Sequence, residues 1–107
     1  MRASLIAIAL LTFLGLQPAT AQEFSITIKD HKFSETELKV PAGKRISLTV
    51  INDDATPEEF ESHSLKVEKV IPGKSKAVVR FGPLKPGKYN FVGEFHESTA
   101  KGVVIAE

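Results

Sequence analysis

The sequence of 107 residues contains no cysteine and no tryptophan. The absence of cysteine excludes disulfide bonds, thiolate catalysis and every thiolate ligand to a metal ion. A domain this small that lacks disulfides must be stabilised by its own hydrophobic core, by a bound metal ion, or by both. Any metal ligands are therefore expected among oxygen and nitrogen groups.

There is also no strong excess of charge of one sign. Lysine and arginine number 14 and aspartate and glutamate 13, which gives a formal net charge of +1. A balanced charge provides no long-range field that would attract nucleic acid or an anionic membrane. The sequence lacks a nucleophile elbow that combines serine, histidine and an acid, so we do not expect a hydrolase. A ferroxidase-like redox role is the enzymatic alternative that stays open.

The N-terminal segment has the pattern of a secretory signal peptide. A short positive start that contains Arg2 precedes an apolar run over residues 5–16, and Ala19-Thr20-Ala21 is an A-x-A cleavage site. The apolar run is too short to span a membrane. We therefore predict a signal peptide over residues 1–21 and one domain over residues 22–107. The expected location is the periplasm, without membrane insertion after cleavage.

The remainder of the chain has a periodicity of two, which is typical of half-buried β-strands. Apolar residues alternate with polar ones in three early segments, at Phe24, Ile26 and Ile28, at Leu38 and Val40, and at Ile46, Leu48 and Val50. Further strands are indicated around Val67, Val79, Phe91 and Val104. Seven or eight short strands separated by turn residues predict an all-β Greek-key sandwich or barrel. No segment of this domain shows a helical period.

Two polar loops concentrate carboxylates and imidazoles. The first spans residues 58–63 and the second residues 94–97. Their candidate metal ligands are Glu59, Glu61, His63, Glu94, His96 and Glu97. Within each loop, an acid and a histidine two residues apart point to the same side of an extended chain. Imidazole and carboxylate donors without sulfur suit Cu(II), Fe(II), Fe(III) or Zn(II).

Each of these residues also has a simpler structural interpretation. Most exposed glutamates are solvated and bind nothing. His63 is close to the alternating face of Leu65 and Val67, so it could be a strand residue that faces solvent. We interpret His31, which lies outside both loops, as a surface residue. Tyr89 follows the corner at Pro86-Gly87, where a tyrosine hydroxyl commonly bonds back to the backbone.

Two segments resemble cupredoxins, the family that includes the blue copper proteins. They are VPAGKRISLTVIN at residues 40–52 and LKPGKYNFVGEFHESTAKGVVIAE at residues 84–107. Laid onto the copper-ligand pattern, the cysteine position falls at Gly93 and one histidine position at His96. The axial methionine falls at about Thr99 or Ala100, and the earlier histidine falls within residues 61–63, most simply at His63. The resemblance implies a cupredoxin-like fold, but two of the four ligands of a blue copper centre are missing.

The chain is similar to the cupredoxin-like domain of EfeO-type periplasmic iron-uptake proteins in the order of its segments, which is E-F-E-S, a strand, Pro-Gly, a second strand and PG-x-Y. That resemblance implies a role in handling copper or iron. The EfeO-type domain often carries cysteines near its candidate site. The corresponding positions in this sequence are occupied by Phe33 and Gly93.

Two functions of different class follow from the sequence. The first is a periplasmic metal-binding protein that binds copper or iron and assists iron transport or metal handling. Its expected partners are the metal ion and a periplasmic or inner-membrane component of iron transport. The second is a metal-free cupredoxin-like module that binds another protein through its acidic loops.

Overall fold

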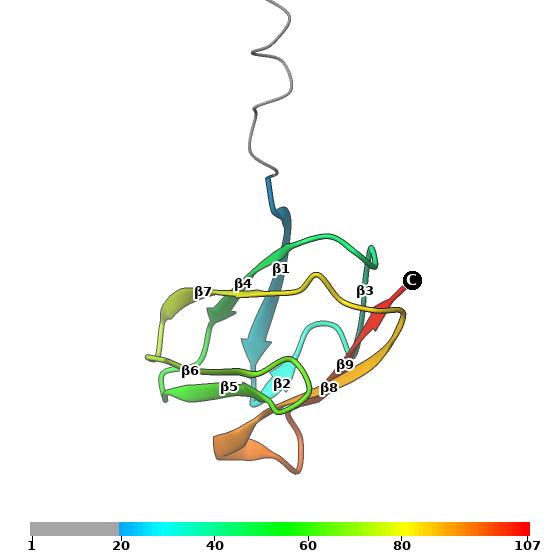
Figure 1. The fold of residues 1–107 in the computed structure, drawn as a ribbon. Coiled ribbons are helices and arrows are strands. Elements are labelled where there is room, and N and C mark those ends of the chain that lie inside the picture. The colour runs from blue at the N-terminus through cyan, green and yellow to red at the C-terminus, as the bar shows by residue number, and fades with distance from the viewer. Residues whose placement is uncertain (1–19) are drawn as a thin grey trace, which may run out of the picture.

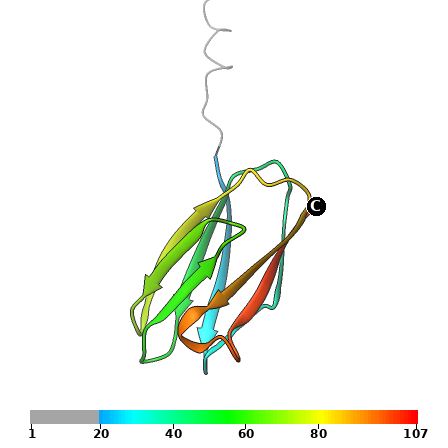
Figure 2. The ribbon, with the colours of Figure 1, turned by 60° about the horizontal axis from the view of Figure 1, so that its bottom comes forward.

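The computed structural model describes residues 20–107, which form two β-sheets packed face to face (Figure 1). The predicted signal peptide over residues 1–21 lies outside this range except for Thr20 and Ala21. Among the described residues, no helix is long and apolar enough to cross a membrane. Figure 2 shows the strands of the two sheets running side by side along the length of the domain.

The first sheet has four strands in the order β2-β1-β4-β7. They are β1 (Gln22–Lys29), β2 (Lys32–Phe33), β4 (Ile46–Asn52) and β7 (Ser75–Phe81). Strands β1 and β4 are parallel, and the other neighbours are antiparallel. In β4 every second residue is buried, from Ile46 to Asn52, because one face of the strand lies against the opposite sheet.

The second sheet has five strands in the order β3-β9-β8-β5-β6. They are β3 (Glu37–Val40), β5 (Glu58–Ser62), β6 (Val67–Ile71), β8 (Gly87–Gly93) and β9 (Lys101–Ala106). Strands β3 and β9 are parallel and the other pairs antiparallel. A 3-10 helix, η2 (Glu94–His96), follows β8. The predicted all-β sandwich is confirmed, and η2 is a single short turn that the strand periodicity does not reveal.

The core joins the two sheets through apolar side chains that alternate along the strands. At its centre the rings of Phe33, Phe60 and Phe91 pack together, with centroids 5.0–6.1 Å apart. Gly102 faces the ring of Phe91, and a Cβ atom there would lie 2.3 Å from Phe91 Cζ. Phe60 and Phe91 belong to β5 and β8, so this aromatic group fixes both strands. The prediction of a polar loop over residues 58–63 is wrong, because most of that segment is β5, whereas residues 94–97 follow β8 as a turn.

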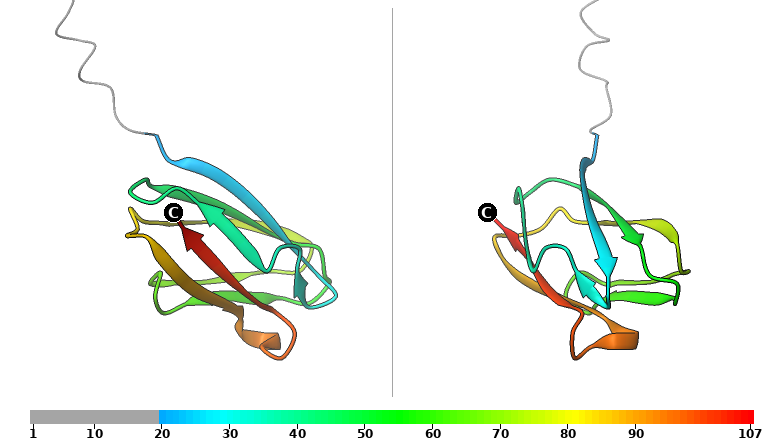
Figure 3. Two further views of the ribbon diagram at one scale, coloured as in Figure 1. Left: turned by 90° about the vertical axis from the view of Figure 1, so that its right-hand side faces the viewer. Right: turned by 180° about the vertical axis from the view of Figure 1, so that it is seen from behind.

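The corner before β8 is stabilised as the sequence predicts. The Tyr89 hydroxyl donates a 2.7 Å hydrogen bond to the backbone carbonyl of Lys85. At the other end of β8, η2 and the loop after it lie at the end of the sandwich opposite the start of β1 (Figures 1 and 3). The turn between β1 and β2 reaches the same end, so residues far apart in sequence meet there.

Candidate metal site

Strand β5 directs its acidic side chains to two opposite faces. Glu58, Phe60 and Ser62 are buried, whereas Glu59 and Glu61 are partly exposed on the outer face of the sheet. This is the ordinary alternation of a β-strand. The consequence is that neighbouring glutamates of one strand belong to two different environments.

On the outer face, four carboxylates form a cluster. Glu59, Glu61, Glu68 and Glu94 each place an oxygen so that all four oxygens lie within 4.8 Å of one another. Glu61 and Glu68 are direct partners across β5 and β6, and Glu94 begins η2 beside them. Three of these residues were predicted as ligands from sequence, and Glu68 was not. Cross-strand pairing brings Glu68 in, which the sequence does not reveal without the strand register.

The clustered negative charges raise the proton affinity of two of these acids. The pKa of Glu61 is raised from 4.5 to about 7, chiefly by hydrogen bonding to Glu94 and then by burial and by Glu68. The pKa of Glu59 is raised as well, again chiefly by Glu94. Like-charged carboxylates that share a site cannot all ionise without cost. The cluster is therefore a place where a cation would relieve repulsion.

This repulsion predicts a pH dependence of the metal-free domain. Because the folded-state pKa of Glu61 lies above its unfolded value, the folded state binds more protons between pH 4.5 and about 7. The free energy of unfolding should therefore fall as pH rises through this window. Melting temperatures measured against pH should show the decline in the wild type and a smaller decline in Glu61→Gln. Parallel curves for the two proteins would contradict the assignment.

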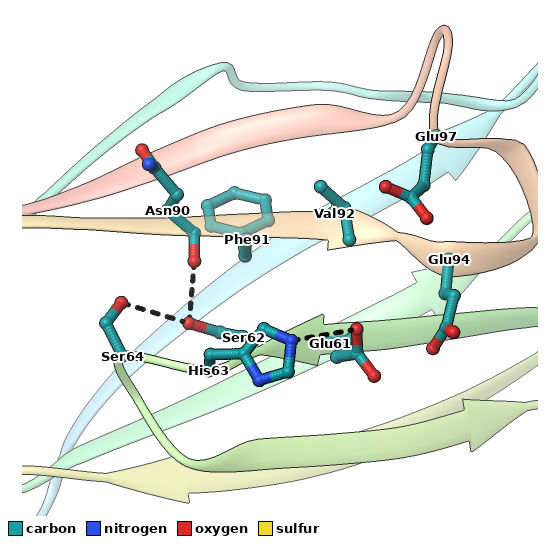
Figure 4. A pocket seen from close by; sticks show the side chains of 9 residues that line it. All are labelled: Glu61, Ser62, His63, Ser64, Asn90, Phe91, Val92, Glu94 and Glu97. Carbon is teal, nitrogen blue, oxygen red and sulfur yellow. Dashed lines mark hydrogen bonds and ion pairs between the residues drawn. The ribbon is translucent and has the colours of Figure 1, made fainter.

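The remaining predicted ligands are spread around this cluster. A cavity of about 560 Å³ is lined by Glu61, His63, Glu94 and Glu97 together with residues of β8 (Figure 4). The His63 side chain is 97% exposed, and its Nε2 atom lies 3.8 Å from Glu61 Oε1. Glu97 is exposed and faces the same cavity. His63 is thus beside the cluster, without being held in it.

His96 lies apart from the four carboxylates. Its Nδ1 atom is 2.6 Å from Oε2 of Glu58, the buried acid on the inner face of β5. The other oxygen of Glu58 accepts hydrogen bonds from the backbone N–H groups of Glu59 and Phe95. Only 1% of Glu58 is exposed. Sequence reasoning missed Glu58, although its spacing of two from Phe60 is a signal that it faces inward.

His31 also joins this end of the sandwich, although the sequence suggested a surface position. Its ring stacks on that of His96, with centroids 3.5 Å apart and planes 10° from parallel. Asp30 and His31 have positive φ angles of 53° and 56°, and their N–H groups both donate to the carboxylate of Asp54. These two bonds lower the pKa of Asp54, the one from His31 most. The left-handed turn is thereby held in the shape that places the ring of His31 on His96.

The region around Gly93 does not fit a blue copper centre. A Cβ atom at Gly93 would lie 2.7 Å from Glu58 Cδ, 2.9 Å from its Oε2 and 2.8 Å from the Cβ atom of Ala100. The space that a cysteine side chain would need at this position is therefore filled by the carboxyl group of Glu58. A type-1 copper site needs that thiolate. The donors that are present are carboxylate oxygens and imidazole nitrogens.

Comparison with known proteins agrees with this architecture. A family model described as a cupredoxin-like domain matches residues 2–106. An uncharacterized protein of Rickettsia prowazekii (strain Madrid E) is 47% identical over 83 residues, which cover 78% of this chain and 66% of that protein, just under two thirds of its length.

Solved structures show the same fold at low identity. Auracyanin A, a blue copper protein from Chloroflexus aurantiacus, is 15% identical, with a TM-score of 0.69 over 82% of this chain and 100% of that one. Amicyanin from Paracoccus versutus is 18% identical, with a TM-score of 0.62 over 87% of each chain. At these identities the likeness concerns the fold, and the ligands must be judged from this chain's own residues.

Proposed function

Because the chain belongs to the family of cupredoxin-like domains, which often bind copper or act in electron transfer, we propose that it binds a transition-metal cation through the outer-face carboxylate cluster. The observation that carries this proposal is the convergence of Glu59, Glu61, Glu68 and Glu94, whose oxygens lie within 4.8 Å of one another. Two strands, β5 and β6, and the 3-10 helix η2 supply these carboxylates. The cation is held as cargo, and no redox step is assigned to it.

The chemistry of the donors favours hard ions. Carboxylate oxygens prefer Fe(III), Fe(II) or Mn(II) over soft ions such as Cu(I), and Cu(II) remains a candidate because of its high general affinity. In the described part of the chain, no lysine or arginine forms an ion pair with these four acids. Their charge is therefore left for a ligand to neutralise. His63 is near enough to Glu61 to add a nitrogen ligand after a side-chain rotation.

The proposed biological setting is metal handling in the periplasm, in the service of iron transport. The support for this setting is the predicted signal peptide together with the likeness of E-F-E-S and the following strands to EfeO-type domains. An open, partly exposed site suits a carrier that receives and releases an ion. Its proposed partner is a periplasmic or inner-membrane component of an iron-transport system.

The experiment is a titration of the metal-stripped domain, residues 22–107, with Fe(III) and with Cu(II). Binding is measured by calorimetry and by EPR. We expect one saturable site for Fe(III) in the wild type, at the outer-face carboxylate cluster. The double variant Glu61→Gln/Glu94→Gln should lose affinity by on the order of a hundredfold, since even indirect disturbance of a metal site costs about 10–100-fold. The substitutions keep side-chain shape and remove two negative charges.

The matched control is Glu35→Gln/Glu37→Gln, which removes two exposed acids away from the cluster. A second variant, His63→Ala/His96→Ala, asks whether either imidazole contributes a ligand. Equal affinities of the wild type and Glu61→Gln/Glu94→Gln would contradict the site. The second candidate function, a metal-free module, is favoured by the same unneutralised charge. If the folded protein binds none of these metals, we would infer that this surface binds a basic protein partner instead.

A further inference from the structure

On the inner face of β5, both oxygens of the buried Glu58 carboxylate have hydrogen-bond partners. Its Oε1 atom accepts the N–H groups of Glu59 at 3.0 Å and Phe95 at 2.8 Å. Its Oε2 atom lies 2.6 Å from Nδ1 of His96. Two of these three partners are in η2, so Glu58 attaches that turn to the strand. No other acid of the described chain is this deeply buried.

This arrangement determines where the proton of His96 is held. An ionised carboxylate can only accept hydrogen bonds, so the short contact requires the proton to be on Nδ1. In the neutral imidazole, Nε2 then keeps its lone pair. Nε2 makes no hydrogen bond within the described residues, and no buried side-chain nitrogen or oxygen there lacks a partner, so Nε2 is in contact with solvent.

The stacked ring of His31 leaves this nitrogen accessible. Stacking covers one face of the His96 ring, whereas the lone pair of Nε2 lies in the plane of the ring. The ring is thus fixed along one edge by Glu58 and on one face by His31, with its free edge at the surface. A histidine that donates one N–H to a carboxylate and offers the other nitrogen is the common arrangement of metal-binding imidazoles.

We propose that Glu58 is the positioning residue of His96: by accepting the Nδ1 proton, it leaves Nε2 as the atom that His96 offers to a divalent cation such as Zn(II) or Cu(II). This inference goes beyond the proposed function, because it makes His96 a nitrogen donor separate from the outer-face carboxylates. Glu58 lies on the inner face of β5 and Glu59 and Glu61 on its outer face, and the group of four carboxylates does not include His96.

The test uses Glu58→Gln, which keeps the size and shape of the side chain. The glutamine Oε1 would retain both backbone hydrogen bonds, and its amide N–H would point at Nδ1 of His96. Nδ1 must then become the acceptor, so the proton should move to Nε2. Long-range ¹H–¹⁵N NMR spectra of the metal-free protein, in mildly alkaline buffer where imidazole is neutral, report which nitrogen carries the proton.

We expect the Nδ1–H form in the wild type and the Nε2–H form in Glu58→Gln. Added Zn(II) should shift the ¹⁵N signal of Nε2 in the wild type, and its apparent affinity should fall at least about tenfold in the variant. His96→Gln should abolish the shift, and thermal unfolding should show that both variants fold. A wild-type Nε2–H form, an unchanged form in Glu58→Gln, or a Zn(II) shift at Nδ1 would each overturn the proposal.

These outcomes are separable from the proposed function. The tautomer of His96 is determined in the metal-free protein. Zn(II) binding is followed by the ¹⁵N signal of His96 Nε2, which does not report on the outer-face carboxylates. Glu61→Gln/Glu94→Gln should leave both readouts unchanged even where it abolishes binding of Fe(III). A Zn(II) response at Nε2 that disappears in this double variant would mean one shared site and would also overturn the inference.

Discussion

Replacing Phe60 by alanine should lower the free energy of unfolding by about 3–5 kcal/mol, the cost usual for deleting a fully buried phenylalanine ring. Phe60 is 0% exposed and contacts the rings of both Phe33 and Phe91. The loss combines reduced hydrophobic burial with a cavity between the two sheets. For a domain of this size, that is a large part of the total stability, so the variant should unfold at far lower urea concentration.

Phe95→Ala is the matched control, because the Phe95 side chain is 49% exposed. It should change stability by less than about 0.5 kcal/mol, as surface substitutions usually do. Urea titrations followed by circular dichroism would compare the two variants. Similar losses in both would mean that the aromatic group of Phe33, Phe60 and Phe91 is not the centre of the core.

Gly93→Cys should not create a blue copper centre, and it should destabilise the fold by about 1–3 kcal/mol through overpacking. The new Cβ atom would clash with the carboxyl group of Glu58 and with Ala100. The carboxyl group cannot simply withdraw, because Glu59, Phe95 and His96 all bond to it. Visible spectra with Cu(II) should therefore lack the intense absorption that a copper–thiolate bond gives.

A double-mutant cycle separates the clash from other effects of the thiol. Gly93→Ala should cost nearly as much as Gly93→Cys, since the Cβ atom is responsible for the overlap. In Gly93→Ala/Glu58→Ala, where the carboxyl group is gone, the combined loss should be smaller than the sum of the single losses. Additive losses, or an intense blue colour in Gly93→Cys, would show that Glu58 does not fill this space.

The fold could be predicted from the sequence because its signals are local. Alternation in segments such as that of Ile46, Leu48 and Val50 gives strands, and the Pro-Gly corners give their ends. The tyrosine corner at Tyr89 follows from its position alone, and the hydrogen bond to Lys85 confirms it. Pattern, turn chemistry and core all agree in these segments, which is the condition under which sequence reasoning succeeds.

The site was less predictable because it depends on contacts between distant segments. Glu68 joins Glu61 only through the register of β5 with β6. His31 reaches His96 only because Asp54, more than 20 residues away, holds a left-handed turn. Glu58 looked like one more acid in a polar loop, since burial of a carboxylate is rare and needs partners that the sequence does not display. These are properties of pairing and burial, and composition does not contain them.

The alternation of acids along β5 also limits how this protein can change during evolution. In a strand, an insertion or deletion of one residue reverses the face of every side chain beyond it. Such a change within β5, directly after Glu58, would turn Glu59 and Glu61 toward the core and expel Phe60 from it. Length variation among descendants of this chain should therefore fall outside β5, while the spacing from Glu58 to Ser62 stays constant.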